Sequence, residues 1–203
     1  MQPRGVMEAI PRKAFFTWAS RAGIGINPRY PASGFISLIP SRRHARFWEL
    51  PADSVRWPHF VATMVAGLDE WKTAYLWPRS GGWPAAPEEW SHNEAARDVL
   101  LHSIGIPRGW AGAVRLIRGE QDKLLAVLTT YCTFGGCVDD DLFFVPDHGK
   151  QLLHSDHHDA IHVECASKKR LLQLVKHMAE AGFDLPTELP DPTFKRPAWM
   201  TGD

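Results

Sequence analysis

The stretch from residue 112 to residue 165 restricts the possible folds more than any other part of the sequence. Short apolar segments alternate there with polar turns, most of which contain glycine, as is typical of antiparallel strands joined by hairpins. The expected strands cover residues 113–117, 124–131, 142–145, 151–154 and 161–165. In the last strand, Ile161, Val163 and Cys165 alternate with His162 and Glu164, which predicts one buried face and one polar face.

Helical periodicity marks three other segments. An apolar stripe at helical spacing predicts a helix over 58–72. Ser91 and Glu94 have the spacing of a capping box and predict the start of a helix over 92–104. A third stripe predicts a helix over 168–181. The expected fold class is α+β, in which an antiparallel meander of about five strands (112–165) packs with these three helices.

One domain is expected over 1–203, because 203 residues with 44% hydrophobic side chains suit a single core. Glycine and proline interrupt residues 1–56 so often that an irregular N-terminal segment is expected there. Residues 186–203 contain Pro190, Pro192 and Pro197, which favours an extended tail.

The charge pattern excludes little by itself. The 23 basic and 23 acidic side chains cancel, so the composition gives no support to general nucleic-acid binding. A basic cluster at Arg42, Arg43 and Arg46 leaves a nucleic-acid contact as the weakest alternative. No segment approaches the roughly eighteen apolar residues of a membrane span, and no signal-peptide pattern is evident. Three cysteines, an odd number, fit a reducing compartment, so a cytoplasmic protein without a membrane partner is expected.

Histidines concentrate the chemistry of this sequence. Five of the ten lie between residues 148 and 162, with aspartates among them. Imidazole and carboxylate groups that converge from two strands and their turn suit a divalent transition metal such as zinc, nickel or iron. The candidate ligands are His154, Asp156, His157, His158 and His162. The same groups could instead hold a water for general-base catalysis, or they could belong to a solvated hairpin tip.

Cys132 and Cys137 form one Cys-x4-Cys pair. A structural zinc site needs two further ligands at a defined distance, which this pair lacks. We therefore expect buried free thiols on neighbouring strands.

Two further sets of residues suit contact with a partner protein. The first set is Trp77, Trp83 and Trp90. These tryptophans fall in or next to a Pro/Gly-rich connection, where an indole either packs on proline or serves as an exposed interface anchor. The second set is Asp139, Asp140 and Asp141. Three adjacent carboxylates repel one another, so solvent, a cation or a basic partner surface must offset their charge.

The sequence lacks a phosphate-binding loop, a dinucleotide fingerprint and a serine-nucleophile motif, which argues against nucleotide-dependent and serine-hydrolase functions. The first hypothesis is a cytoplasmic, non-catalytic protein-binding module of an inhibitory or immunity type, without a cofactor. Its acidic, His-rich sheet end and its Trp-rich loop would bind a protein with a basic surface. The alternative is a small metal-dependent hydrolase with a His/Asp site at 154–162, for which zinc is the first candidate metal.

Overall fold

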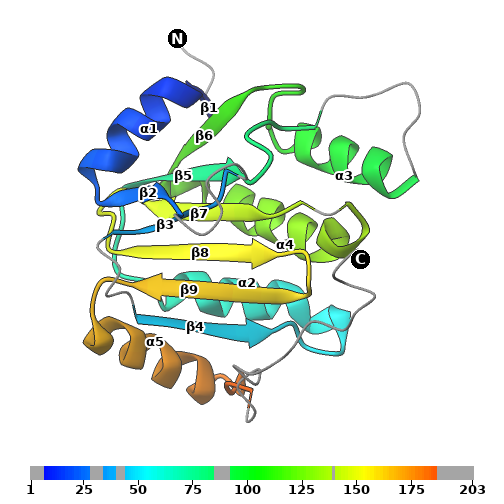
Figure 1. Cartoon of the computed structure of the whole chain (residues 1–203). Helices are drawn as coiled ribbons and strands as arrows, with labels where there is room; N and C mark the ends of the chain where they lie inside the picture. The colour runs from blue at the N-terminus through cyan, green and yellow to red at the C-terminus, as the bar shows by residue number, and fades with distance from the viewer. Residues whose placement is uncertain (1–6, 28–33, 40–43, 85–91, 139, 187–203) are drawn as a thin grey trace, which may run out of the picture.

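A seven-stranded antiparallel sheet forms the centre of the protein (Figure 1). The computed structural model describes residues 7–27, 34–39, 44–84, 92–138 and 140–186. In spatial order the strands are β1 (Glu8–Pro11), β6 (Gly112–Ile117), β5 (Thr73–Pro78), β7 (Leu142–Pro146), β8 (Gln151–Asp156), β9 (Ala160–Cys165) and β4 (His44–Glu49). A second, two-stranded sheet consists of β2 (Ile24–Ile26) and β3 (Ile36–Leu38).

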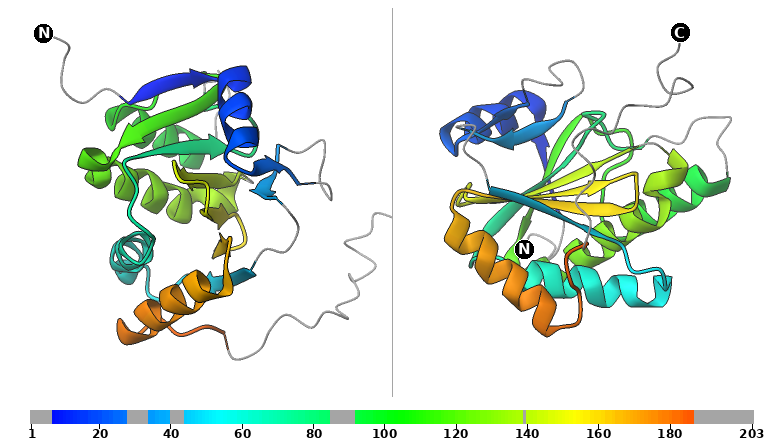
Figure 2. Two further views of the ribbon diagram at one scale, coloured as in Figure 1. Left: turned by 90° about the vertical axis from the view of Figure 1, so that its left-hand side faces the viewer. Right: turned by 60° about the horizontal axis from the view of Figure 1, so that its bottom comes forward.

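Both faces of the large sheet carry further elements (Figure 2). One face carries the helices α2 (Trp57–Ala66), α3 (His92–Ser103) and α4 (Gln121–Val138), with α5 (Lys168–Glu180) beside β4 and β9. Short 3-10 helices, Ser54–Arg56 and Arg118–Glu120, precede α2 and α4. The other face carries α1 (Arg12–Arg21) and the β2–β3 pair, whose strand β3 contacts β8 and β9.

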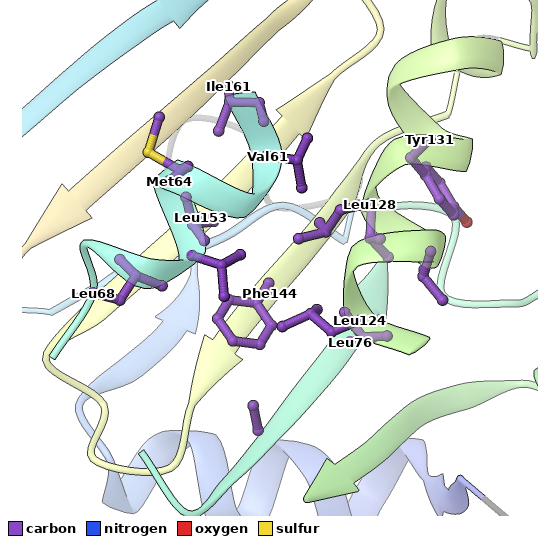
Figure 3. Packing of buried hydrophobic residues seen from close by; sticks show 14 of the residues in the cluster. Val61, Met64, Leu68, Leu76, Leu124, Leu128, Tyr131, Phe144, Leu153 and Ile161 are labelled. Carbon is purple, nitrogen blue, oxygen red and sulfur yellow. The ribbon is translucent and has the colours of Figure 1, made fainter. Parts of the chain in front are cut away.

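The larger hydrophobic core lies between the sheet and helices α2 and α4 (Figure 3). Alternate residues of the central strands point into this core, because successive side chains of a strand face opposite sides. Among them are Leu76, Phe144, Leu153 and Ile161. A smaller core on the other face joins α1 and β2–β3 to the sheet through Phe15, Ile36, Trp77, Phe143 and Leu152. Each such side chain stabilises the fold by about 1.5–3 kcal/mol, so both layers contribute.

The predicted α+β class is confirmed, because helices pack on an antiparallel sheet. The strands expected over 113–117, 142–145, 151–154 and 161–165 correspond to β6, β7, β8 and β9. Helices α3 and α5 match the expected ones closely. Helix α2 ends at Ala66 and not at residue 72, because the chain leaves the helix at Gly67 and continues toward β5.

The strand expected over 124–131 is wrong, because these residues lie in α4. Leu124, Val127, Leu128 and Tyr131 have the spacing of one helical face, and all four are buried. The segment resembles a strand in composition, but this spacing allows a helix to bury all four residues on one side. The sheet also departs from a simple meander, because β5 lies between β6 and β7.

The sequence predicts an irregular segment over residues 1–56, but the described part of this segment has regular secondary structure. It contains α1 and the strands β1 to β4, and β1 and β4 form the two edges of the large sheet. These strands are only three to six residues long, too short for a period of two to be recognised among glycines and prolines.

Other sequence expectations concern the ends of the chain and membranes. Of the tail expected over 186–203, residues 187–203 lie outside the described residues. Within the described ranges, no helix combines the length and the apolar character needed to cross a bilayer.

Candidate functional site

A pocket of about 520 Å³ opens on the sheet face that carries β2 and β3. Strand alternation brings Leu152, His154 and Asp156 of β8 to this face, together with His162 and Glu164 of β9. The walls are completed by the β8–β9 turn, by β3 and β4, by β7 with the residue before it, and by the residue that follows β5. The volume lies within the range of about 300–1,000 Å³ that is usual for small-molecule sites.

A row of aromatic rings crosses five neighbouring strands and includes two of the histidines. In register, Trp77 of β5 pairs with Phe143, Phe143 with His154, His154 with His162, and His162 with Phe47 of β4. The ring of His154 stacks on Phe143 at a centroid distance of 4.5 Å and lies 5.2 Å from the ring of His162. This row fixes the planes of both imidazoles at the pocket.

Five side chains in the pocket alternate between imidazole and carboxylate, and we call them the His–Asp network: His154, Asp141, His157, Asp156 and His162. Nε2 of His154 lies 3.1 Å from Oδ2 of Asp141, and Oδ1 of Asp141 lies 2.6 Å from Nδ1 of His157. The same Nδ1 lies 3.4 Å from Oδ1 of Asp156. Finally, Oδ2 of Asp156 lies 3.0 Å from Nε2 of His162. Each carboxylate thus joins His157 to one histidine of the aromatic row.

The tight β8–β9 turn explains how adjacent residues enter this network. Oδ1 of Asp156 accepts a hydrogen bond from the backbone N–H of His158 at 2.8 Å, which closes an Asx turn. Asp159 has φ of 59°, a left-handed conformation that aspartate tolerates better than most residues. The chain therefore reverses within three residues and leaves His157 beside both carboxylates.

The surroundings keep both carboxylates of the network ionised. Burial by itself raises the pKa of Asp141, but the rings of His154 and His157 outweigh burial and hold this pKa below its ordinary value. Burial likewise opposes ionisation of Asp156, yet hydrogen bonds from His162 and from the backbone of His158 keep its pKa far below the usual range. For His154, burial dominates and lowers the pKa. At neutral pH, Asp141 and Asp156 are charged and His154 is neutral.

Two buried atoms of the network have no hydrogen bond. Nε2 of His154 and Oδ2 of Asp141 are close, but their geometry is not that of a hydrogen bond, and neither atom has another such partner. His154 is 7% exposed and Asp141 is fully buried, so bulk water does not satisfy them. The guanidinium of Arg79 lies 3.4 Å from the same Oδ2 and supplies positive charge.

Asp156, His157 and His158 are the group best placed to hold a metal ion. One ligand atom of each lies within 4.8 Å of the other two. In the part of the chain that the structure describes, no further group of three histidine, cysteine or acidic residues has this spacing. His154 and His162, the other ligands named from the sequence, line the same pocket without belonging to this group.

Trp77 and Trp83, the two described tryptophans of the predicted partner-binding set, are not exposed. Trp77 lies in the central strand β5, where it is buried and donates its indole N–H to the carbonyl of Gly34 at 2.9 Å. Trp83 is buried and donates to the carbonyl of Gly112 at 3.0 Å. Trp90 lies outside the described residues. Trp77 is therefore a core residue of a strand and does not pack on proline in a surface loop.

Asp140 and Asp141, the two described residues of the acidic run, are also buried. Asp141 belongs to the His–Asp network, whereas Asp140 is buried beside Arg97 and Tyr131, whose polar atoms lie 3.5 Å from its Oδ2. Asp139 lies outside the described residues. The two described aspartates have different surroundings because adjacent side chains of an extended segment point to opposite sides.

Two charged residues that line the pocket, Glu164 and Arg79, are absent from the sequence-based site. Glu164 accepts a hydrogen bond from the backbone N–H of Leu38 at 2.9 Å and so ties β3 to β9. Its position two residues after His162 placed it on the same strand face, which is a usable signal. Arg79 reaches Asp141 only because β5 pairs with β7, and no local sequence signal predicts this pairing.

The cysteines and the basic cluster add no site among the described residues. Cys132 and Cys137 both belong to α4, so their expected placement on neighbouring strands is wrong. Cys132 and Cys165 are free and buried, and burial raises the pKa of Cys132 to about 12 and that of Cys165 to about 11. Neither is a thiolate at neutral pH. Arg46 is exposed on β4, and residues 40–43, which include Arg42 and Arg43, lie outside the described part.

Comparison with known proteins gives no match for this chain: no family model fits it, and neither a curated protein nor a solved structure is detectably similar.

Proposed function

We propose that the pocket is the active site of a small hydrolase that depends on a divalent transition metal, with zinc as the first candidate. Asp156, His157 and His158 would hold the ion. The observation that carries the proposal is the convergence of their ligand atoms, within 4.8 Å of one another, at a pocket large enough for a small substrate. One carboxylate and two imidazoles are the ligands of many catalytic zinc sites, which leave a fourth position for water.

The charge of the pocket supports a cation. The described residues that line it include three carboxylates and one guanidinium. The carboxylates belong to Asp141, Asp156 and Glu164, and the guanidinium belongs to Arg79. The histidine in the interior of the pocket, His154, is neutral at neutral pH. The carboxylates therefore outnumber the guanidinium by two, and a divalent ion would balance this difference.

Asp141 would orient the ligand His157. A metal-bound imidazole usually donates its other ring N–H to a carboxylate, which fixes the tautomer and raises the basicity of the ring. Oδ1 of Asp141 lies 2.6 Å from Nδ1 of His157, so this pair would keep the proton on Nδ1 and the lone pair on Nε2. The neighbouring imidazole of His162 forms a hydrogen bond with Asp156 and would serve as a proton acceptor beside this site.

The test is the metal content of purified, untagged protein after reconstitution with zinc. We expect a stoichiometry near one per chain, which is lost in the double variant His157→Asn/His158→Asn. His59→Asn is the matched control, because His59 is exposed on α2, away from the residues that line the pocket. The double variant His154→Asn/His162→Asn should keep the metal, since neither residue belongs to the ligand group. A wild-type stoichiometry near zero with zinc, nickel, iron and manganese would contradict the proposal.

A further inference from the structure

We propose that the pocket binds an aromatic ring of its substrate over the edges of His154 and His162, beside Phe35, so that the substrate is a small aromatic ester or amide. This inference deepens the proposed metal-dependent hydrolysis and rests on it for the reaction. The binding of the ring depends on shape and apolar contact, and it is tested without the metal.

The ring of Phe35 already shows how this surface receives an aromatic group. Phe143 and His154 stack with their centroids 4.5 Å apart and their planes 10° apart, so their faces cover each other and their edges remain for a third ring. Phe35 lies 5.3 Å from Phe143 and 4.9 Å from His154, with interplanar angles of 78° and 79°. These values are typical of edge-to-face pairs. Because the three centroids form a nearly equilateral triangle, Phe35 lies across the edges of both rings.

The aromatic row continues past Phe35 into a more open part of the pocket. His162 follows His154 in this row at a centroid distance of 5.2 Å, with the planes 27° apart. The side chain of His162 is 39% exposed, whereas that of His154 is 9% exposed, so the edge of the row becomes accessible at His162. A planar ring placed over His154 and His162 would repeat the arrangement that Phe35 already has one step earlier in the row.

The walls around this place favour a flat apolar group. Phe35 lies on one side, and Ala45 of β4 lines the pocket on the other. In register, Ala45 pairs with Glu164, two residues along β9 from His162, and its small side chain leaves room for a ligand ring. Edge-to-face contact with the imidazoles requires no particular protonation state, because their ring carbons carry hydrogens in every state. A saturated ring of the same size would lack this contact.

The place of the ring suits cleavage of a bond at the proposed metal site. Asp156 follows His154 on the same face of β8, two residues or about 7 Å along the strand. A carbonyl group attached to the ring, directly or through one carbon atom, would cover most of this distance. In the reaction, the oxygen of water bonds to the carbonyl carbon, and the bond to the ester oxygen or amide nitrogen breaks. The leaving group departs as an alcohol or amine with one proton of the water, and the other product is the aromatic acid.

The experiment compares methyl phenylacetate with methyl cyclohexylacetate, which has a saturated six-membered ring, and with methyl acetate. Binding to zinc-free protein is followed by NMR titration at millimolar concentration. We expect the phenyl ester to bind about 2- to 10-fold more tightly than the cyclohexyl ester, because only the phenyl ring makes edge-to-face contacts. Both should bind more tightly than methyl acetate, which buries less apolar surface. Nuclear Overhauser effects should connect the phenyl hydrogens to the rings of Phe35 and His162, and ester cleavage should require zinc.

Ala45→Trp tests the position of the ring, because the indole would fill the space that the ligand ring needs. We expect the affinity for methyl phenylacetate to fall at least about 10-fold. Arg46→Trp is the matched control, since Arg46 is exposed and the next residue of β4 points to the opposite face of the sheet. This control should bind the ester like the wild type.

Several outcomes would overturn the inference. They are equal binding of the phenyl and cyclohexyl esters, no binding of either, Overhauser effects to other parts of the protein, or unchanged affinity in a folded Ala45→Trp variant. If Ala45→Trp does not fold, the Overhauser effects and the wild-type comparison decide. Absence of zinc binding with an intact preference for the phenyl ester would instead overturn the proposed hydrolase.

Discussion

Oδ1 of Asp141 lies 2.6 Å from Nδ1 of His157, and this contact joins two parts of the sequence that had been interpreted separately. Asp141 comes from an acidic run just before β7, whereas His157 comes from the His-rich turn after β8. Antiparallel pairing of β7 with β8 places Leu142 opposite Ser155, so the residues that flank this pair meet at one end of the sheet. The carboxylate is fully buried, and its charge is stabilised mainly by side chains of the pocket.

Asp141→Asn keeps the side-chain volume but removes the charge that faces Arg79, His154 and His157. We expect the free energy of unfolding at pH 7 to fall by about 1–3 kcal/mol, because the partly buried guanidinium of Arg79 loses its charged partner and the buried contact with His157 is weakened. The pKa values of Asp141 and Asp156 are lowered in the folded state, so their stabilisation is present above about pH 4 and is lost as the pH falls through the folded pKa values. The variant should therefore lose less stability than the wild type between pH 5 and pH 2, as urea unfolding would show.

Asp184→Asn is the control for that measurement, because Asp184 is exposed. It should change the free energy of unfolding by less than about 0.5 kcal/mol. An Asp141→Asn variant as stable as this control would mean that the charge of Asp141 contributes nothing.

The sequence allowed the α+β class and most of the sheet to be predicted, because hairpins depend on local signals. The turns at Pro146–Gly149 and at His157–Asp159 determine the pairing of β7, β8 and β9. Strand β5 was missed because its position between β6 and β7 is decided by long-range pairing, and because Trp77-Pro78 resembles a loop. Helix α4 was missed because its β-branched residues outweighed the three- and four-residue spacing of Leu124, Val127 and Leu128.

The candidate site was predictable only where it is local. His154, Asp156, His157, His158 and His162 all line the pocket, and strand alternation with one turn is enough to gather them. The role of Asp141 was not predictable, because a run of aspartates suggests solvent. Its charge is partly offset by Arg79, which follows β5 and lies 62 residues earlier in the chain.

Asp140 is expected to make the protein less stable as the pH rises from about 4 to 6. Burial raises its pKa to about 6, although Arg97 partly offsets this effect. The unfolded chain releases this proton near pH 4, while the folded chain retains it up to about pH 6, so the free energy of unfolding falls across this interval. The expected size is on the order of 1–3 kcal/mol for a shift of this direction and extent.

Asp140→Asn should remove this fall, which urea titrations at pH 4, 5, 6 and 7 would show. Arg97→Met should raise the pKa of Asp140 further and extend the fall to higher pH, as carboxyl chemical shifts in NMR would report. An unchanged pH profile in Asp140→Asn would disprove the assignment.

Leu128→Ala tests the packing of α4. Leu128 is buried with Val61 and Phe144 in the larger core, so the substitution leaves a cavity and should lower the free energy of unfolding by about 2–5 kcal/mol. Thr133→Ala, on the exposed side of the same helix, should change it by less than about 0.5 kcal/mol. Equal effects of the two variants in chemical unfolding would be incompatible with the observed face of α4.

Trp77→Phe tests how the β2–β3 pair is held over the pocket. The indole of Trp77 stacks on Phe15 at 4.9 Å and donates to the carbonyl of Gly34, just before the segment of Phe35 and Ile36 that lines the pocket. Phenylalanine preserves the stacking but leaves this carbonyl unpaired, so we expect a loss of about 1–3 kcal/mol.

The matched control is Trp110→Phe, because Trp110 also donates its indole N–H to a carbonyl, that of Ala113 at 3.1 Å, but it does not contact β2 or β3 through this bond. Both variants should be destabilised. Only Trp77→Phe should speed hydrogen exchange of the β2–β3 amides relative to those of β8 and β9. In this variant the hydrogen bond to Gly34 is already absent, so local opening of the small sheet costs less free energy. If the β2–β3 amides exchange equally fast in the two variants, Trp77 contributes to the core alone, and the hydrophobic contacts of Ile36 and Phe35 hold this side of the pocket without it.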